Sequence, residues 1–106
     1  LGDIRKYDLL QEIKPLNDFK DDIREFFDLV LFWYRDVLLY KAAGSEEQLI
    51  FREQSLEIRH QAERCSYHGL QLILEAIATA DRRIRANVNF DLTIEMLALT
   101  IKENIR

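Results

Sequence analysis

The chain has 106 residues, of which 48% are hydrophobic, and its 15 Lys and Arg against 19 Asp and Glu give a formal net charge of −4. That length suits one domain with a single core, and three glycines with one proline are too few for a turn-rich β-sandwich. The negative charge argues against a dedicated nucleic-acid-binding domain, which normally carries a basic excess. A single cysteine favours a reducing, cytoplasmic location, and charges interrupt each apolar run before it reaches the length of a membrane span.

Apolar residues recur at helical spacing from the start of the chain. Residues 3–14 predict a first helix, which breaks near Pro15. A long second helix begins at Asn17 or Asp18 and ends at Gly44, a glycine in the C-capping position. This helix is apolar over so wide an arc that we expect it to be central, buried on two sides or by a second chain. Its two stripes consist of Phe19, Ile23, Phe26, Val30, Trp33 and Val37, and of Phe27, Leu31, Tyr34 and Leu38.

The second half of the chain continues the helical pattern. Residues 45–54 predict a connector and about 54–65 a third helix, after which Ser66 caps a fourth. The segment Asn87-Val88-Asn89 supplies a C-terminal stop and a new N-cap, and a fifth helix covers about 90–104. That helix is apolar on one face through Phe90, Ile94, Leu97 and Ile101, and on another through Leu92, Met96 and Leu99.

These elements predict an all-α fold, a single five-helix bundle over residues 1–106. The first residue is Leu1 rather than methionine, from which we expect a fragment of a longer chain. A strand pair outside the 45–54 connector would contradict this fold.

A search for catalytic and metal-binding patterns predicts no catalytic, cofactor-binding or metal site. The three glycines are isolated, so no loop can cradle phosphates, and there is no G-x-S-x-G motif for a nucleophilic serine. His60, Cys65 and His68 have a metal-like spacing, but a structural zinc site normally has four ligands at tighter spacing. A core thiol with two surface or interface histidines is the simpler interpretation. The acids of the second helix lack the E-x-x-H pairs of a di-metal bundle.

Two charges, Arg35 and Asp36, lie inside the most apolar stretch of the chain. Either both reach a wet edge, or they pair across a helix or subunit contact, since an unpaired charge is poorly tolerated there. The aromatic residues Trp33, Tyr34 and Tyr40 fit a core or a protein interface. The Arg82, Arg83 and Arg85 cluster fits a solvated face or an interface ion pair better than a phosphate site.

Two segments resemble a known family. WYRDVLLYKAAG at 33–44 and ILEAIATADRRIRANVNFDLTIEMLALTI at 73–101 are similar to the C-terminal domain of bacterial DNA polymerase III clamp-loader subunits. The delta-prime subunit is the most similar and gamma/tau the second choice. The residues that match are Trp33, Tyr34, Arg35 and Asp36, and the junction Asn87, Val88 and Asn89, and we expect them to act in architecture.

The resemblance implies a five-helix domain that joins gamma/tau and delta subunits in a ring-like collar. That collar holds together the ATP-driven machine that loads the sliding clamp during DNA replication. The ATPase-type modules and a zinc module would lie upstream, so no catalytic or cofactor residue is carried over to this domain. The full subunit would belong to the DNA polymerase III holoenzyme, a nucleotidyltransferase.

Surplus apolar residues predict where such a domain meets its partners. We expect an exposed patch on the second and fifth helices that binds collar domains of other subunits, or weakly a second copy, with no direct contact to nucleic acid or membrane. Two alternatives remain: a helical regulatory or ligand-binding domain with a dry pocket, and a small metalloenzyme bundle. The predicted anchors are Tyr34, Leu38, Tyr40, Leu92, Met96 and Leu99, with Arg82 and Arg83 at the rim.

Overall fold

The computed structural model describes residues 16–106, with side chains from residue 21 onward. This part contains four α-helices: α2 (Leu16–Ala43), α3 (Ser55–Arg64), α4 (Tyr67–Arg85) and α5 (Phe90–Glu103). A short 3₁₀ turn, η1 (Arg52–Gln54), precedes α3, and residues 16–106 contain no strand. The expected all-α class is therefore confirmed for these residues, but they contain four helices rather than five. The first expected helix, residues 3–14, lies outside the described residues.

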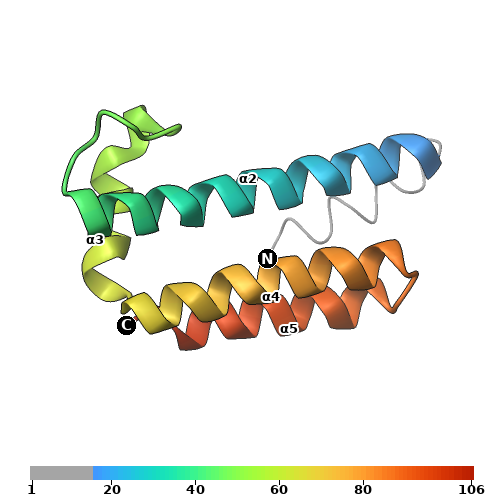
Figure 1. The fold of residues 1–106 in the computed structure, drawn as a ribbon. Helices are drawn as coiled ribbons and strands as arrows, with labels where there is room; N and C mark the ends of the chain where they lie inside the picture. Colours follow the sequence, from blue (N-terminus) through green and yellow to red (C-terminus); the bar gives the residue numbers. More distant parts are fainter. Residues whose placement is uncertain (1–15) are drawn as a thin grey trace.

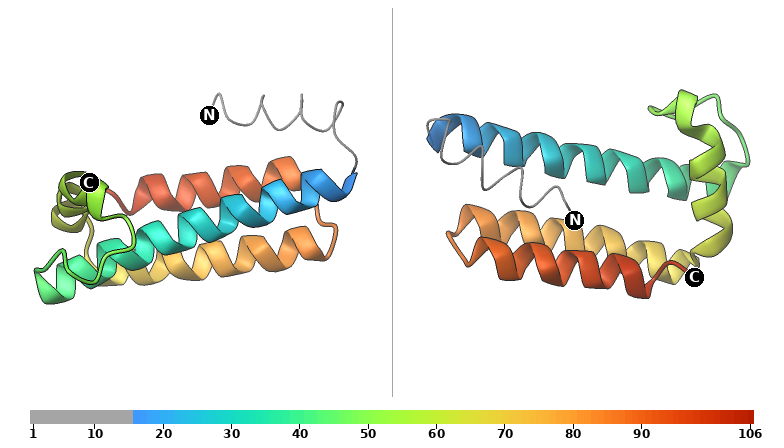
Figure 2. Two further views of the ribbon diagram at one scale, coloured as in Figure 1. Left: turned by 90° about the horizontal axis from the view of Figure 1, so that it is seen from above. Right: turned by 180° about the vertical axis from the view of Figure 1, so that it is seen from behind.

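The helices form two layers (Figure 1). Helices α4 and α5 lie side by side as an antiparallel pair, and α2 runs over the seam between them when the molecule is viewed from above (Figure 2). Helix α3 crosses one end of this three-helix unit. At 28 residues α2 is longer than α4 with its 19, so its C-terminal part extends along α3 and the connector.

The core lies between these layers and contains residues from all four helices. In α4 the apolar residues spaced three and four apart predict one buried line, and Leu70, Ile73, Ile77 and Ala80 are buried, while Ile84 at its end is half-buried. The predicted inner face of α5 is buried through Ile94 and Leu97, and α3 contributes Ile58, Ala62 and Cys65 as expected from its spacing. From α2 the buried apolar residues are Ile23, Phe27, Tyr34 and Val37.

Local hydrogen bonds end the helices close to the predicted positions. Helix α2 ends before Gly44, whose φ of +67° is the left-handed conformation that glycine adopts without strain. The Ser66 side chain accepts a hydrogen bond from the Gly69 amide at 2.9 Å, and this N-cap begins α4. Both boundaries confirm the interpretation of the sequence, because each depends only on residues within one turn.

The Asn87-Val88-Asn89 segment both ends α4 and begins α5. Asn87 has a φ of +59°, and the amides of Asn87 and Val88 donate to the carbonyls of Ile84 and Arg83 at 3.1 and 2.9 Å. This pattern is a Schellman motif with asparagine in the place that glycine usually takes. The Asn89 side chain then accepts from the Leu92 amide at 3.0 Å as the N-cap of α5. The tight reversal holds α4 and α5 antiparallel.

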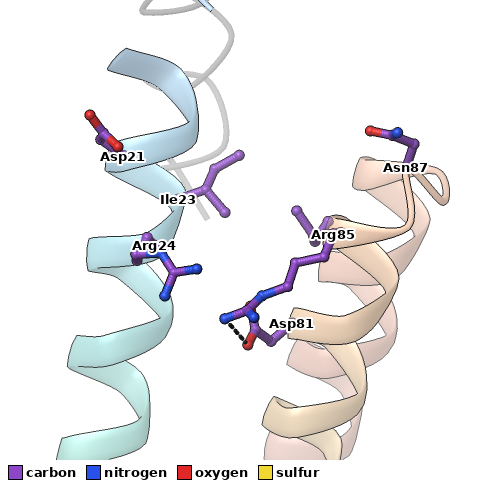
Figure 3. A pocket seen from close by; sticks show the side chains of 7 residues that line it. Asp21, Ile23, Arg24, Asp81, Arg85 and Asn87 are labelled. Atoms are coloured by element: carbon purple, nitrogen blue, oxygen red, sulfur yellow. Dashed lines mark hydrogen bonds and ion pairs between the residues drawn. The ribbon is translucent and has the colours of Figure 1, made fainter. Parts of the chain in front are cut away.

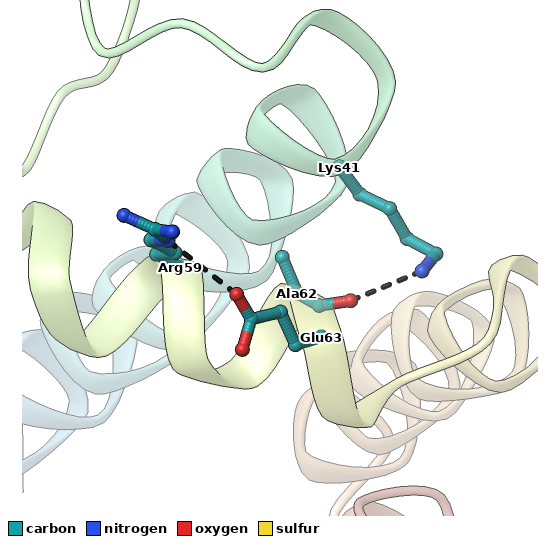
Figure 4. A network of polar contacts seen from close by, with 4 residues as sticks. All are labelled: Lys41, Arg59, Ala62 and Glu63. Carbon is teal, nitrogen blue, oxygen red and sulfur yellow. Dashed lines mark hydrogen bonds and ion pairs between the residues drawn. The ribbon is translucent and has the colours of Figure 1, made fainter.

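One corner of the molecule joins the end of α2 to the end of α3 and the start of α4. Lys41 Nζ donates to the Ala62 carbonyl at 3.0 Å, in the last turn of α3, where the helix dipole favours a cation (Figure 4). Beside Ala62 on α3, Arg59 pairs with Glu63 at 3.4 Å. The Lys41 ammonium also lies 5.1 Å from the ring centroid of Tyr67, whose hydroxyl donates to the Lys41 carbonyl at 3.2 Å. These contacts fix α3 across the end of the bundle.

Candidate protein interface

Helix α5 has a second apolar face that points away from the core. Leu92, Met96 and Leu99 are 53%, 45% and 55% exposed, although Ile94 and Leu97 between them are buried. Their spacing of four and three residues places them in one line along the helix, opposite the buried side. Three large apolar side chains in line on a solvent-exposed face are the feature that protein contacts use. This part of the predicted patch is present and exposed.

A shallow groove runs beside this line, between α5 and α4. It has a volume of about 160 Å³, and Met96 and Thr100 line it from α5. From α4 the lining residues include Ala76, Thr79 and Arg83. Most of these side chains are small, so the surface is hollowed between the two helices.

Of the two arginines predicted at the rim, Arg83 lines the groove from α4, whereas Arg82 does not line it but bonds to Thr79, which does. Arg83 Nη1 donates to Met96 Sδ at 3.5 Å, which places its guanidinium directly beside the exposed line of α5. Arg82 Nη2 donates to Thr79 Oγ1 at 3.2 Å. In the described part of the chain the ion pairs are Arg59–Glu63 and Arg85–Asp81, and neither Arg82 nor Arg83 takes part in one. Among the described residues, neither guanidinium group is paired with a carboxylate, so each can pair with an acidic side chain of a partner protein.

The predicted anchors on α2 need correction. Tyr34 is only 7% exposed and belongs to the core, and Leu38 and Tyr40 are half-buried against it. Burial, and to a smaller extent the negative charge of the nearby Cys65 thiolate, raise the pKa of Tyr34 to about 12. The exposed apolar residues of α2 are others, Leu29 and Phe32 among them. Sequence spacing could not distinguish these sectors, because the helix is apolar over most of its circumference.

The predicted pair of charges on α2 separates in the structure. Arg35 is exposed, whereas Asp36 is 1% exposed and accepts two hydrogen bonds. Its Oδ1 accepts from the Ile50 amide at 3.1 Å and its Oδ2 from the Phe51 amide at 2.8 Å. Neither of the two alternatives raised from the sequence describes this arrangement. A carboxylate inside an apolar run signals that a partner is needed, but the partner here is the backbone of the connector.

Trp33 completes the attachment of the connector to α2. Its indole Nε1 donates to Gln61 Oε1 of α3 at 3.2 Å, and its ring centroid lies 5.5 Å from that of Phe51. Leu49 is buried, whereas Ile50 remains exposed. Three of the four residues of the WYRD motif at 33–36 thus have architectural contacts: Trp33 and Asp36 hold the connector, and Tyr34 packs in the core. Arg35 is exposed.

A larger pocket, of about 320 Å³, opens between the N-terminal part of α2 and the C-terminal end of α4. Arg24 on α2 points toward Arg85 on α4 across this space, and Arg85 is already paired with Asp81 at 3.1 Å (Figure 3). Asp21 also lines it, so two cations and two anions balance. Four of the seven described residues that line it are charged, whereas ligand pockets are lined mostly by apolar and aromatic side chains.

The metal-like spacing noted in the sequence is not assembled into a site. Cys65 is buried, and burial raises the pKa of its thiol, whereas His60 and His68 are exposed. Among residues 16–106 no group of three His, Cys, Asp or Glu side chains is placed to hold a metal ion. None of the helices α2 to α5 combines the length and the apolar character needed to cross a membrane.

Comparison with known proteins identifies one family. A family model described as "DNA polymerase III, delta subunit, C terminal" matches residues 3–103, a range that extends to the end of α5. No curated protein and no solved structure matches the chain. The matched range contains the outer line of α5, the groove beside it and the connector held by Asp36.

Proposed function

The chain belongs to the family of C-terminal domains of the DNA polymerase III delta subunit, and from that premise we propose that it is a collar domain of the delta-prime type. It is a domain of a clamp-loader subunit, and it associates with other clamp-loader subunits. The neighbours that we propose are gamma/tau and delta. In this proposal the domain is the C-terminal part of a longer cytoplasmic protein, and the modules that bind and hydrolyse ATP lie upstream.

The family match over residues 3–103 supports a collar domain of a clamp-loader subunit. The finer assignment to the delta-prime type rests on the resemblance of the segments at 33–44 and 73–101. The surface of the domain supports the collar role, because α5 exposes Leu92, Met96 and Leu99 in addition to the face that it buries. A monomeric domain of this size gains nothing from a second apolar face, whereas a subunit in a ring needs a surface for its neighbour. The domain contributes assembly, and it has no catalytic role of its own in this proposal.

The test is reconstitution of the clamp loader from purified subunits. The full-length subunit and a version that lacks this domain are each mixed with gamma/tau and delta, and the mass of the complex is measured by light scattering. We expect only the full-length subunit to join a complex of defined stoichiometry. If the shortened subunit assembles equally well, the domain is not the collar element.

A second arrangement of the same experiment separates delta-prime from gamma/tau. Clamp loaders are prepared that lack either the delta-prime or the gamma/tau subunit, and the full-length protein is added to each. We expect it to restore clamp loading only where delta-prime is missing. Restoration of the preparation that lacks gamma/tau would reassign the subunit while leaving its place in the family unchanged.

A further inference from the structure

The exposed line of α5 and the groove beside it form one continuous surface. We define the α4–α5 outer face as Leu92, Met96 and Leu99 of α5 together with Ala76, Thr79 and Arg83 of α4. Leu92 and Leu99 form a ridge, Met96 lies at its inner slope, and the small side chains of α4 leave the groove of about 160 Å³. A ridge beside a groove is the shape into which the side-chain rows of another helix pack.

The dimensions of this face suit a short stretch of helix. Leu92 and Leu99 are seven residues apart, which is roughly 10 Å or two turns along the axis. A partner helix with apolar side chains at the same i, i+4, i+7 spacing would therefore contact the whole line. An extended strand would not fit, because the described part of the chain offers no sheet edge to which it could add.

Charges on the two sides of the face define the partner further. Arg82 and Arg83 lie on the α4 side, near the reversal into α5, and neither has a carboxylate partner among the described residues. Asp91 and Glu95, four residues apart on α5, are exposed on the flank that is turned away from α4. A complementary helix therefore needs carboxylates on the flank that faces α4 and basic side chains on the other.

We infer that the α4–α5 outer face receives an amphipathic helix of a neighbouring clamp-loader subunit, apolar at i, i+4 and i+7 and acidic on the flank that meets Arg82 and Arg83. This inference rests on the proposed function and assigns one surface and one kind of partner to it. A second copy of this chain is a poorer occupant, because two chains that each carry a net charge of −4 repel one another.

The test measures the affinity of the full-length subunit for a complex of gamma/tau and delta subunits. Met96→Asp and Leu99→Asp should each weaken assembly by about 30-fold or more, since each places a charge in the centre of the contact. Arg83→Glu should weaken it about fivefold to tenfold at low salt, and the difference from wild type should shrink as salt screens the contact. The matched control is Leu29→Asp, an equally exposed leucine on α2, which should change the affinity by less than twofold.

The outcomes separate this inference from the function on which it rests. If the wild-type subunit fails to join gamma/tau and delta, the proposed function is wrong. If the wild type assembles and the α5 variants assemble as tightly, the function stands and the assigned surface is wrong. If Leu29→Asp is the damaging change, the contact lies on α2. Sedimentation that shows a dimer of the wild type, lost in Met96→Asp, would replace the partner helix with a second copy.

Circular dichroism of each variant ensures that a lost contact is not a lost fold. All of the mutated side chains are at least partly exposed, so we expect the helical signal to be unchanged. If Met96→Asp nevertheless unfolds, the affinity of Arg83→Glu at low and high salt still tests whether this face binds an acidic partner. An Arg83→Glu variant that assembles with wild-type affinity at low salt would overturn the assignment of an acidic partner.

Discussion

Replacing Asp36 with alanine removes a carboxylate that holds the connector against α2. The amides of Ile50 and Phe51 donate to its two oxygens at 3.1 and 2.8 Å, from residues 14 and 15 positions further along the chain. A hydrogen bond to a charged group contributes about 1.5–3 kcal/mol net, so the two together contribute about 3–6 kcal/mol. Removing a buried charge also recovers part of its desolvation penalty, which reduces the net loss.

We therefore expect Asp36→Ala to lower the free energy of unfolding by about 2–4 kcal/mol, a large share of the ~5–15 kcal/mol typical of a domain. Asp36→Asn should lie between the wild type and the alanine variant. Its amide keeps one oxygen that can accept a hydrogen bond, but its NH₂ group meets a backbone N–H, where a donor faces a donor.

The assay is urea unfolding of the 106-residue chain, followed by circular dichroism and by the fluorescence of Trp33, its single tryptophan. Because the Trp33 ring lies 5.5 Å from that of Phe51, its emission reports on the connector directly. The control is Asp28→Ala, which removes an exposed carboxylate from the same helix and should change the stability by less than about 0.5 kcal/mol. If Asp36→Ala is as stable as this control, the two hydrogen bonds do not hold the connector and the reasoning is refuted.

Three further predictions concern pH, the α4–α5 reversal and nucleotide binding. Because burial raises the pKa of Tyr34 from 10.0 to about 12, the folded chain keeps the phenol proton to higher pH than the unfolded chain. The contribution of Tyr34 to the free energy of unfolding is therefore fully present below pH 10 and falls by up to about 2–3 kcal/mol towards pH 12. Urea unfolding at a series of pH values should show this loss in the wild type and not in Tyr34→Phe; an identical loss in both would assign it to other groups. Asn87 has a φ of +59°, so Asn87→Val should lower stability by about 1–2 kcal/mol in thermal melts while Asn87→Gly should not, and an equal effect of both would contradict the strain argument. Calorimetric titration of the chain with ATP and magnesium should give no heat of binding, because the sequence has no glycine-rich phosphate loop; micromolar affinity would be incompatible with this expectation.

Helix boundaries were predictable from the sequence because they depend on neighbouring residues. Gly44, Ser66, Asn87 and Asn89 each act through their own backbone conformation or through hydrogen bonds that span at most five residues. The buried stripe of α4 follows from spacing in the same way. The family was indicated by the order of two longer segments, and the family model confirms it at the level of a clamp-loader subunit domain.

The sector of α2 that is buried could not be predicted from the same pattern. The pattern predicts Tyr34 as an exposed anchor, but Tyr34 lies in the core. Leu29 and Phe32, which the pattern does not distinguish from their apolar neighbours, are exposed. Helix α2 has more apolar residues than one side of a helix can bury, so periodicity alone permits several orientations. The positions of α4 beneath it and of the connector beside it choose between them.

By itself, then, the sequence determined the helical class, the helix ends and the apolar lines along each helix, because those depend on interactions within a turn or two. Tertiary structure decided which of two apolar lines became core and which remained on the surface. In α5, Ile94 and Leu97 are buried, whereas Leu92, Met96 and Leu99 are exposed. It also brought the Asp36 carboxylate to the connector amides and the Arg83 guanidinium to Met96. These contacts join residues that are more than ten positions apart, and their pairing depends on how whole helices cross rather than on any local spacing.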